Sequence, residues 1–83
     1  MNIYTVFSNI DQSSDQLFLA STDERMSRDF ASNIRARNAE LVAKKFPPVS
    51  VADNTIYCLG SYDPKTMKIS LLDTPRQVEY VID

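Results

Sequence analysis

The chain lacks histidine and tryptophan altogether, and its 83 residues include a single cysteine and a single glycine. Without histidine it has neither the commonest general base nor the usual zinc ligand. A lone cysteine with no histidine partner is a poor catalytic nucleophile, and one glycine cannot build a glycine-rich phosphate-binding loop. These absences argue against an enzyme, and we expect neither a cofactor nor a metal site.

Long apolar runs are also missing. No stretch approaches the roughly 18 apolar residues that a membrane-spanning helix needs, and the chain does not open with a basic leader followed by an apolar segment. We therefore expect no membrane contact and no signal peptide. The cysteine, Cys58, lies in an apolar strand-like run, where a buried thiol is the usual outcome, and this suits a reducing cytoplasm.

The length predicts one small domain over residues 1–83. A chain of this size buries only about 60% of the surface that its unfolded form exposes, so its stability is modest. Small domains often gain the missing stability by association, and we therefore expect a homo-oligomer.

The first third of the chain predicts two strands and the start of a helix. Residues 2–8 carry apolar side chains on both faces, which is typical of a central strand. Residues 17–20 predict a short strand that forms a hairpin with the first. Ser21 or Thr22 then caps a helix, and Ser21 with Glu24 fits a capping box.

The helix presents one narrow apolar stripe, formed by Met26, Phe30 and Ile34. At 100° per residue, Arg37 would fall back into this stripe, and a charged side chain is out of place there. We therefore expect the first helix to end near Ala36.

Two further segments complete the helical and C-terminal part of the prediction. Residues 39–46 fit a second short helix, which Pro47 and Pro48 would stop. Residues 74–83 fit either a helix with proline in its first turn or, by their alternating branched and aromatic residues, a strand. We favour the strand.

Residues 54–72 predict two strands around a tight turn. Asp63 and Pro64 supply the turn, because proline presets φ and aspartate bonds the backbone two residues on. Together these elements predict an α+β fold: an antiparallel sheet of four to five strands, with one main helix and with or without a second short one packed on one face.

This hairpin carries a pattern of the form Leu/Ile-Tyr-x-Leu-Gly-x-Phe/Tyr-Asp-x-x-Thr-Gly-x-Ile. The matching residues are Ile56, Tyr57, Leu59, Gly60, Tyr62, Asp63, Thr66 and Ile69, while Met67 stands at the second glycine position. With the opening segment Met1–Val6 and the helix pattern, the chain resembles the small nonstructural protein of the gokushovirus-type microviruses, which are single-stranded-DNA phages.

The resemblance implies a phage protein in the cytoplasm of the infected bacterial host. It also implies a role with viral DNA, at the switch from duplex replication to single-strand synthesis and packaging into the procapsid. The implied partners are viral DNA, as single strand or replicative form, and phage replication or procapsid proteins.

Charge is unevenly distributed along the chain, although the net charge is only −2. Residues 25–45 include six basic and two acidic residues, which gives this segment a net charge of +4. We predict that these six contact DNA phosphates without sequence preference: Arg25, Arg28, Arg35, Arg37, Lys44 and Lys45. The competing interpretation is a solvated helix face, because Glu24 with Arg28 and Arg25 with Asp29 form i,i+4 pairs that would partly neutralise it.

The aromatic residues of the predicted strands could stack single-stranded bases on an exposed sheet face; the alternative is that they form the core. The position numbers of Tyr57 and Tyr62 differ by an odd number, so the two side chains point to opposite faces of a regular strand. They share a face only if a bulge at Gly60 resets the alternation.

Two other functions compete with direct DNA binding. The acidic pI of about 4.9 favours a protein–protein adaptor that docks on a replication protein or procapsid without touching DNA. A mimic of DNA would need its acidic residues in a regular array, and their scatter along the sequence does not indicate one.

Overall fold

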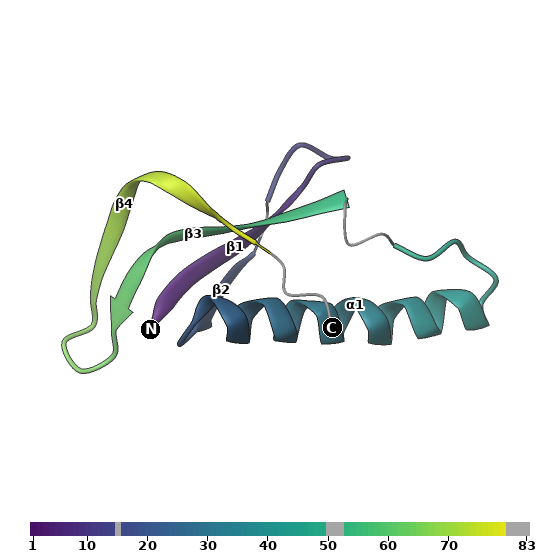
Figure 1. Cartoon of the computed structure of the whole chain (residues 1–83), viewed down its shortest axis with the longest axis horizontal. Helices are drawn as coiled ribbons and strands as arrows, with labels where there is room; N and C mark the ends of the chain where they lie inside the picture. The colour runs from purple at the N-terminus through teal and green to yellow at the C-terminus, as the bar shows by residue number, and fades with distance from the viewer. Residues whose placement is uncertain (15, 50–52, 80–83) are drawn as a thin grey trace.

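The computed structural model describes residues 1–14, 16–49 and 53–79, which form four strands and one helix. The elements are β1 (Asn2–Ser8), β2 (Leu17–Ala20), α1 (Asp23–Ala43), β3 (Asn54–Asp63) and β4 (Lys68–Val78). The strands pair antiparallel in the order β2-β1-β3-β4, and α1 lies along one face of the sheet (Figure 1). The predicted α+β fold is confirmed, with β1 as a central strand.

The hydrophobic core lies between α1 and the facing side of the sheet. Tyr4 from β1 and Ile56 from β3 are fully buried there. The predicted helical stripe packs against them, and Cys58 is a buried free thiol. The whole core cluster consists of Tyr4, Ala20, Met26, Phe30, Ile34, Ile56, Cys58 and Val78. No helix in the described ranges is long and apolar enough to cross a membrane.

The helix begins at one of the two predicted caps but ends later than predicted. Thr22, and not Ser21, is the N-cap: its Oγ1 accepts a hydrogen bond from the Arg25 N–H at 3.1 Å. The expected end near Ala36 and the separate helix over residues 39–46 are both wrong, because α1 runs unbroken to Ala43. Arg37 does not interrupt it because the side chain is solvent-exposed beside an open cleft, where its charge stays hydrated.

The C-terminus of α1 is closed by a Schellman motif that has a lysine in place of the usual glycine. The Phe46 N–H donates to the Leu41 carbonyl at 2.8 Å, and the Lys45 N–H donates to the Val42 carbonyl at 3.0 Å. Lys45 adopts a left-handed φ of 63° to permit these bonds. Asn38 then holds the returning chain through two hydrogen bonds between its amide and the backbone of Val49.

One carboxylate connects α1 to two strands. Arg76 of β4 donates two hydrogen bonds to Asp23, at 2.8 Å to Oδ2 and 3.1 Å to Oδ1. The Tyr4 hydroxyl donates to the same Oδ1 at 2.6 Å and accepts from the Asn2 amide at 2.9 Å. Both oxygens of Asp23 are therefore engaged, by residues of two separate strands.

These contacts shift the pKa values of the groups involved. Hydrogen bonds from Arg76 and then from Tyr4 lower the pKa of the Asp23 carboxyl. Burial, reinforced by the hydrogen bond to Asp23, raises the pKa of Tyr4 to about 12. The Asp23 carboxylate is thus stabilised in its charged form and Tyr4 in its neutral form. The hydrogen bond between them needs both, because the Tyr4 hydroxyl donates its proton to a carboxylate oxygen.

The β3–β4 hairpin is bent by a bulge in each strand. Opposite β1, Cys58 and Gly60 are paired in succession, which leaves Leu59 as an extra residue. Opposite β3, the pairing passes from Leu71 to Arg76, so that residues 72–75 leave the ladder. Pro75 lies in this unpaired part of an edge strand, which is where a proline is tolerated.

Gly60 is required by the close approach of β4 at this bend. A Cβ atom built on Gly60 would lie 2.1 Å from the Ser70 carbonyl oxygen and 2.9 Å from the Leu71 Cα, and both are backbone atoms. No side chain can move aside to relieve such a contact. The requirement is therefore one of space, since the φ of Gly60 is not positive.

The turn that joins β3 and β4 follows its predicted chemistry. The Asp63 Oδ1 accepts a hydrogen bond from the Lys65 N–H at 2.9 Å, and this bond lowers the pKa of the Asp63 carboxyl. Met67 closes the loop with a left-handed φ of 62°, and its N–H donates to the Asp63 carbonyl at 2.7 Å. Its side chain is 74% exposed.

The end of the chain agrees with the favoured prediction as far as it is described. β4 continues through residues 74–78, so this part of the predicted segment is a strand. Val78 is buried against the core. The remaining residues of that prediction, 80–83, lie outside the described residues.

We predict that Met67→Gly stabilises the protein by about 0.5–1 kcal/mol. Glycine adopts a left-handed φ without steric cost, and the exposed methionine side chain contributes little packing. The free energy of unfolding from urea denaturation measures the effect. Met67→Ala is the control, because it removes the side chain and keeps the strained backbone; equal stabilisation by alanine would contradict the argument.

Gly60→Ala should destabilise the protein by about 2 kcal/mol or more, because overpacking against backbone forces the two strands apart. Urea denaturation also measures this change. Ser61→Ala is the matched control at the neighbouring exposed position and should change stability by less than about 0.5 kcal/mol. A Gly60→Ala variant as stable as this control would refute the close approach.

Asp23 should make stability depend on acid pH. Its pKa is lowered on folding, so its contribution is complete above the unfolded value of about 3.9 and is lost as pH falls through the folded value. The urea midpoint of the native chain should thus fall more steeply below pH 4 than that of Asp23→Asn. Asp29→Asn, which alters an exposed ion pair, should retain the native pH dependence.

Candidate nucleic-acid interface

Three of the six predicted DNA-contacting residues share one face of α1. At 100° per residue, Arg25, Arg28 and Arg35 project within about 80° of arc, and this arc is centred opposite the buried stripe that contains Phe30. All three are exposed. We refer to these three arginines as the basic helical face, which points away from the sheet.

The basic helical face is only partly neutralised. Arg25 forms an ion pair with Asp29 at 3.6 Å, and both side chains are more than half exposed, so the pair is weak. The other predicted pair, Glu24 with Arg28, is not formed. Within the described part of the chain, Arg28 and Arg35 have no ion-pair partner, and their charges are available to an external anion.

The remaining three basic residues lie elsewhere. Arg37 is turned by its position on the helix toward the sheet side, where it lines a cleft. Lys44 and Lys45 follow the last turn of α1, about 28 Å along the axis from Arg25. There their charges complement the negative end of the helix dipole. The six residues therefore do not form a single patch.

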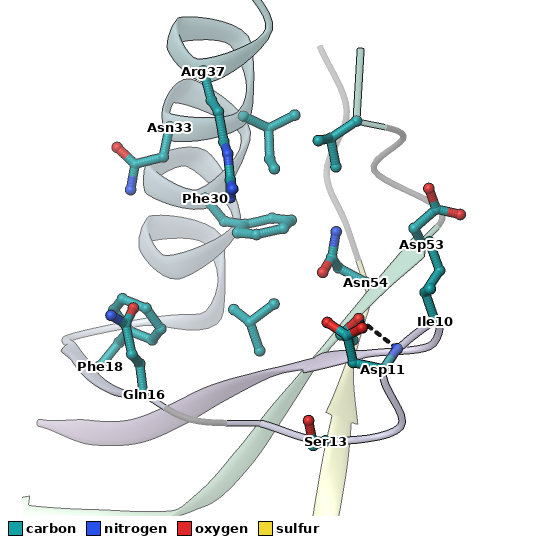
Figure 2. Close-up of a pocket in the computed structure, with 14 residues that line it drawn as sticks. Ile10, Asp11, Ser13, Gln16, Phe18, Phe30, Asn33, Arg37, Asp53 and Asn54 are labelled. Atoms are coloured by element: carbon teal, nitrogen blue, oxygen red, sulfur yellow. Dashed lines mark hydrogen bonds between the residues drawn. The ribbon is translucent and has the colours of Figure 1, made fainter. Parts of the chain in front are cut away.

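A cleft of about 530 Å³ lies between α1, the β1–β2 loop and the start of β3. In Figure 2, Arg37 and Asn33 extend from the helix beside Phe30, while Asp11 and Asp53 lie on the opposite side. Two carboxylates against one guanidinium give the cleft a net negative charge. It is therefore a poor phosphate site and does not extend the basic helical face.

The aromatic residues divide between the core and the other face of the sheet. Tyr4 is a core residue and Phe18 packs against the core, so the stacking hypothesis fails for them. Tyr57 pairs with Thr5 and Gly60 pairs with Ile3, which places Tyr57, Gly60 and hence Tyr62 on one face. The bulge that this required is present.

We call this second sheet surface the outer face, because it is turned away from α1. Phe7 and Tyr57 meet there edge to face, with their ring centroids 6.3 Å apart. Strand pairing and the contacts of Leu59 define the outer face as Ile3, Thr5, Phe7, Leu17, Leu19, Thr55, Tyr57, Leu59, Gly60, Tyr62, Ile69, Leu71 and Gln77.

The extent of the outer face was missed by sequence reasoning, although a signal for it exists. Residues 17–20 are all apolar, so both sides of that strand carry apolar side chains. In residues 69–72, apolar side chains likewise occur at both odd and even positions. Strands of that kind are typical of sheets covered on both faces. The outer face carries no cation that could hold a phosphate backbone, which weakens it as a platform for single-stranded DNA.

Comparison with known proteins gives one match. No curated protein and no solved structure matches the chain significantly. The family described as Phage ORF5 protein matches residues 1–83, which is the whole chain. The chain therefore belongs to the Phage ORF5 protein family and is a bacteriophage protein.

Proposed function

We propose that the chain is a non-enzymatic accessory protein of a gokushovirus-type microvirus, active in the cytoplasm of the infected bacterium. It acts with viral DNA at the switch to single-strand synthesis and packaging. Membership of the phage family and the pattern in the β3–β4 hairpin support this role. The observation that carries DNA contact is the basic helical face, where Arg28 and Arg35 have no ion-pair partner among the described residues.

The contact is electrostatic and weak. Arg28 and Arg35 are two helical turns apart, about 10 Å along the axis, so the face can follow one stretch of backbone. Guanidinium groups bind phosphate oxygens in a planar, two-pronged geometry, but such contacts read no bases. Three charges on a chain of net charge −2 give a salt slope of about −2 to −3, far below that of a dedicated DNA-binding domain.

Lys44 and Lys45 add to the contact where the DNA follows α1 toward its C-terminus, whereas Arg37, which lines the negatively charged cleft, contributes little. Because the two lysines point away from the basic helical face, they engage a different part of the phosphate backbone. Each such contact would increase the magnitude of the salt slope by about 0.9 for duplex DNA. Single alanine variants of these three should therefore have smaller effects than those of the basic helical face.

The double variant Arg28→Ala/Arg35→Ala tests the proposal. It should weaken binding to mixed-sequence DNA equally for all sequences and reduce the salt slope for duplex DNA by about 2. Fluorescence anisotropy at several salt concentrations, with single-stranded and duplex probes, measures both quantities.

The matched control is Lys65→Ala/Lys68→Ala, which removes the same charge from the β3–β4 hairpin. It should leave the salt slope within about 0.5 of the native value. An equal loss of slope in both double variants would show a general charge effect and would contradict the assignment. Absence of binding by the folded native chain at low salt would refute direct DNA contact.

A second candidate is a protein–protein adaptor that docks on a phage replication or procapsid protein without touching DNA. The observation that favours it is the division of the six basic residues between separate surfaces, since DNA-binding domains usually concentrate them in one stripe. The adaptor hypothesis predicts no anisotropy change at low salt. It also predicts retention of the chain by purified replication or procapsid proteins.

A further inference from the structure

The outer face is apolar and uncharged, and its β2 and β4 parts are open to solvent, whereas Ile3 and Thr5 on β1 are only 6% exposed. Leu17 and Leu71 are 70% and 71% exposed, and Ile69 and Leu19 are 61% and 52% exposed. None of the strand residues that pairing places on this face is charged. Contiguous apolar surface of this kind is uncommon on a soluble monomer and marks an interaction site.

No described element of the chain covers this face. The one helix of the described residues, α1, packs on the opposite side of the sheet (Figure 1). The outer face is also hollowed by a groove of about 380 Å³, where β4 leaves β3. Phe7, Tyr57, Leu59 and Pro75 line this groove, so its wall is apolar and could receive an apolar side chain.

The chemistry of the outer face restricts its occupant. A nucleic acid is disfavoured, because no cation stands ready for its phosphates. A charged protein surface would lose its hydration there without gaining a partner. The best complement is another uncharged apolar sheet surface, and the chain itself presents one. We infer that the outer face is the dimer interface of this protein, with a second copy of the chain packed on it.

The sheet edges are less suited to association than the face. At one edge, β2 is only four residues long. At the other edge, β4 carries Lys68 and Pro75 and bulges over residues 72–75. Short strands, lysine, proline and bulges are the features that keep edge strands from pairing with another chain. Packing of face on face remains as the route to association.

A two-fold axis in the interface, running across the strands, gives both copies the same contacts. Ile69 and Leu71 pair with the end of β3 near Tyr62 and Gly60, whereas the groove lies by Tyr57 toward the other end. The axis brings the exposed side chains of each copy over the groove of the other. Two sheets packed in this way lie about 10 Å apart.

A specific dimer requires an extended interface. A standard interface removes about 800 Å² from each partner, which is about one eighth of the 6226 Å² accessible surface of this chain. The outer face spans all four strands of the sheet, over which an interface of this size would have to extend. Its four well-exposed aliphatic side chains also supply the apolar interface core that lasting dimers use.

Sedimentation equilibrium of the full chain tests the inference. The native protein should behave as a dimer of 9.4 kDa subunits with a Kd of about 10 μM or tighter. Leu71→Lys should raise this Kd at least about tenfold, because it places an unpaired ammonium in the apolar interface. Leu17→Lys, on the opposite edge strand, should do the same. Both sites are exposed in the monomer, so the fold should survive, as far-ultraviolet circular dichroism would show.

Val42→Lys is the matched control, because Val42 is 61% exposed but lies on α1, away from the outer face. It should leave the Kd within about twofold of the native value. A native monomer at all concentrations, or a dimer that Leu71→Lys and Leu17→Lys leave intact, would overturn the inference. Since both variants spare the basic helical face, each monomer should still bind a short DNA probe that reaches one face only, so loss of the dimer and loss of that contact are separate results.

Discussion

The Asp23 carboxylate is the contact on which the arrangement of α1 against the sheet depends. It occupies the first turn of α1, accepts from Tyr4 at the centre of the sheet and receives both amino groups of Arg76 from the edge strand. Arg76 follows the four residues of β4 that leave the ladder. The ion pair between Arg76 and Asp23 therefore holds β4 against the rest of the fold directly after the residues where its backbone pairing with β3 is interrupted.

Because of this contact, the helix and the hydrophobic core lie on one side of the sheet. Once Arg76 is fixed, β4 pairs again with β3 and Val78 is buried against the core. The Ser27 hydroxyl then donates to the Glu79 carbonyl at 3.2 Å and holds the strand end against the helix. All of these contacts are on the α1 side, so the one helix among the described residues packs on one face of the sheet and leaves the outer face without a helix.

The elements of the fold were predictable because their signals are local. The stripe of Met26, Phe30 and Ile34 identified the buried side of the helix, and it packs as predicted. The turn at Asp63 and Pro64 formed as its side-chain chemistry indicates. In these cases the local structure is determined by interactions between residues that are close in the sequence.

The errors arose where the cause lies elsewhere in the fold. The helical wheel placed Arg37 in the apolar stripe, and the prediction assumed that the sheet covers this stripe along the whole helix. In the structure the Arg37 side chain lies beside an open cleft instead, so its charge does not end α1. The six basic residues were grouped by their position along the sequence, which does not show that α1 distributes them over two sides and its far end. Scarcity of glycine had a consequence too: Lys45 and Met67 adopt left-handed backbones that glycine usually fills, and propensity alone does not predict this.

The two surfaces of this protein suit different tasks because they lie on opposite sides of a two-layer fold. In the proposed dimer the sheets meet at the centre, so the two basic helical faces point outward in opposite directions. Under the proposed function each face would make only a few phosphate contacts and would be weak by itself, while a dimer would present two of them. A partner with two reachable strands or segments of DNA would then bind far more tightly than one face allows, since the second contact is intramolecular. Such a dimer would bridge DNA segments rather than coat one, and this agrees with an acidic chain that carries few DNA contacts.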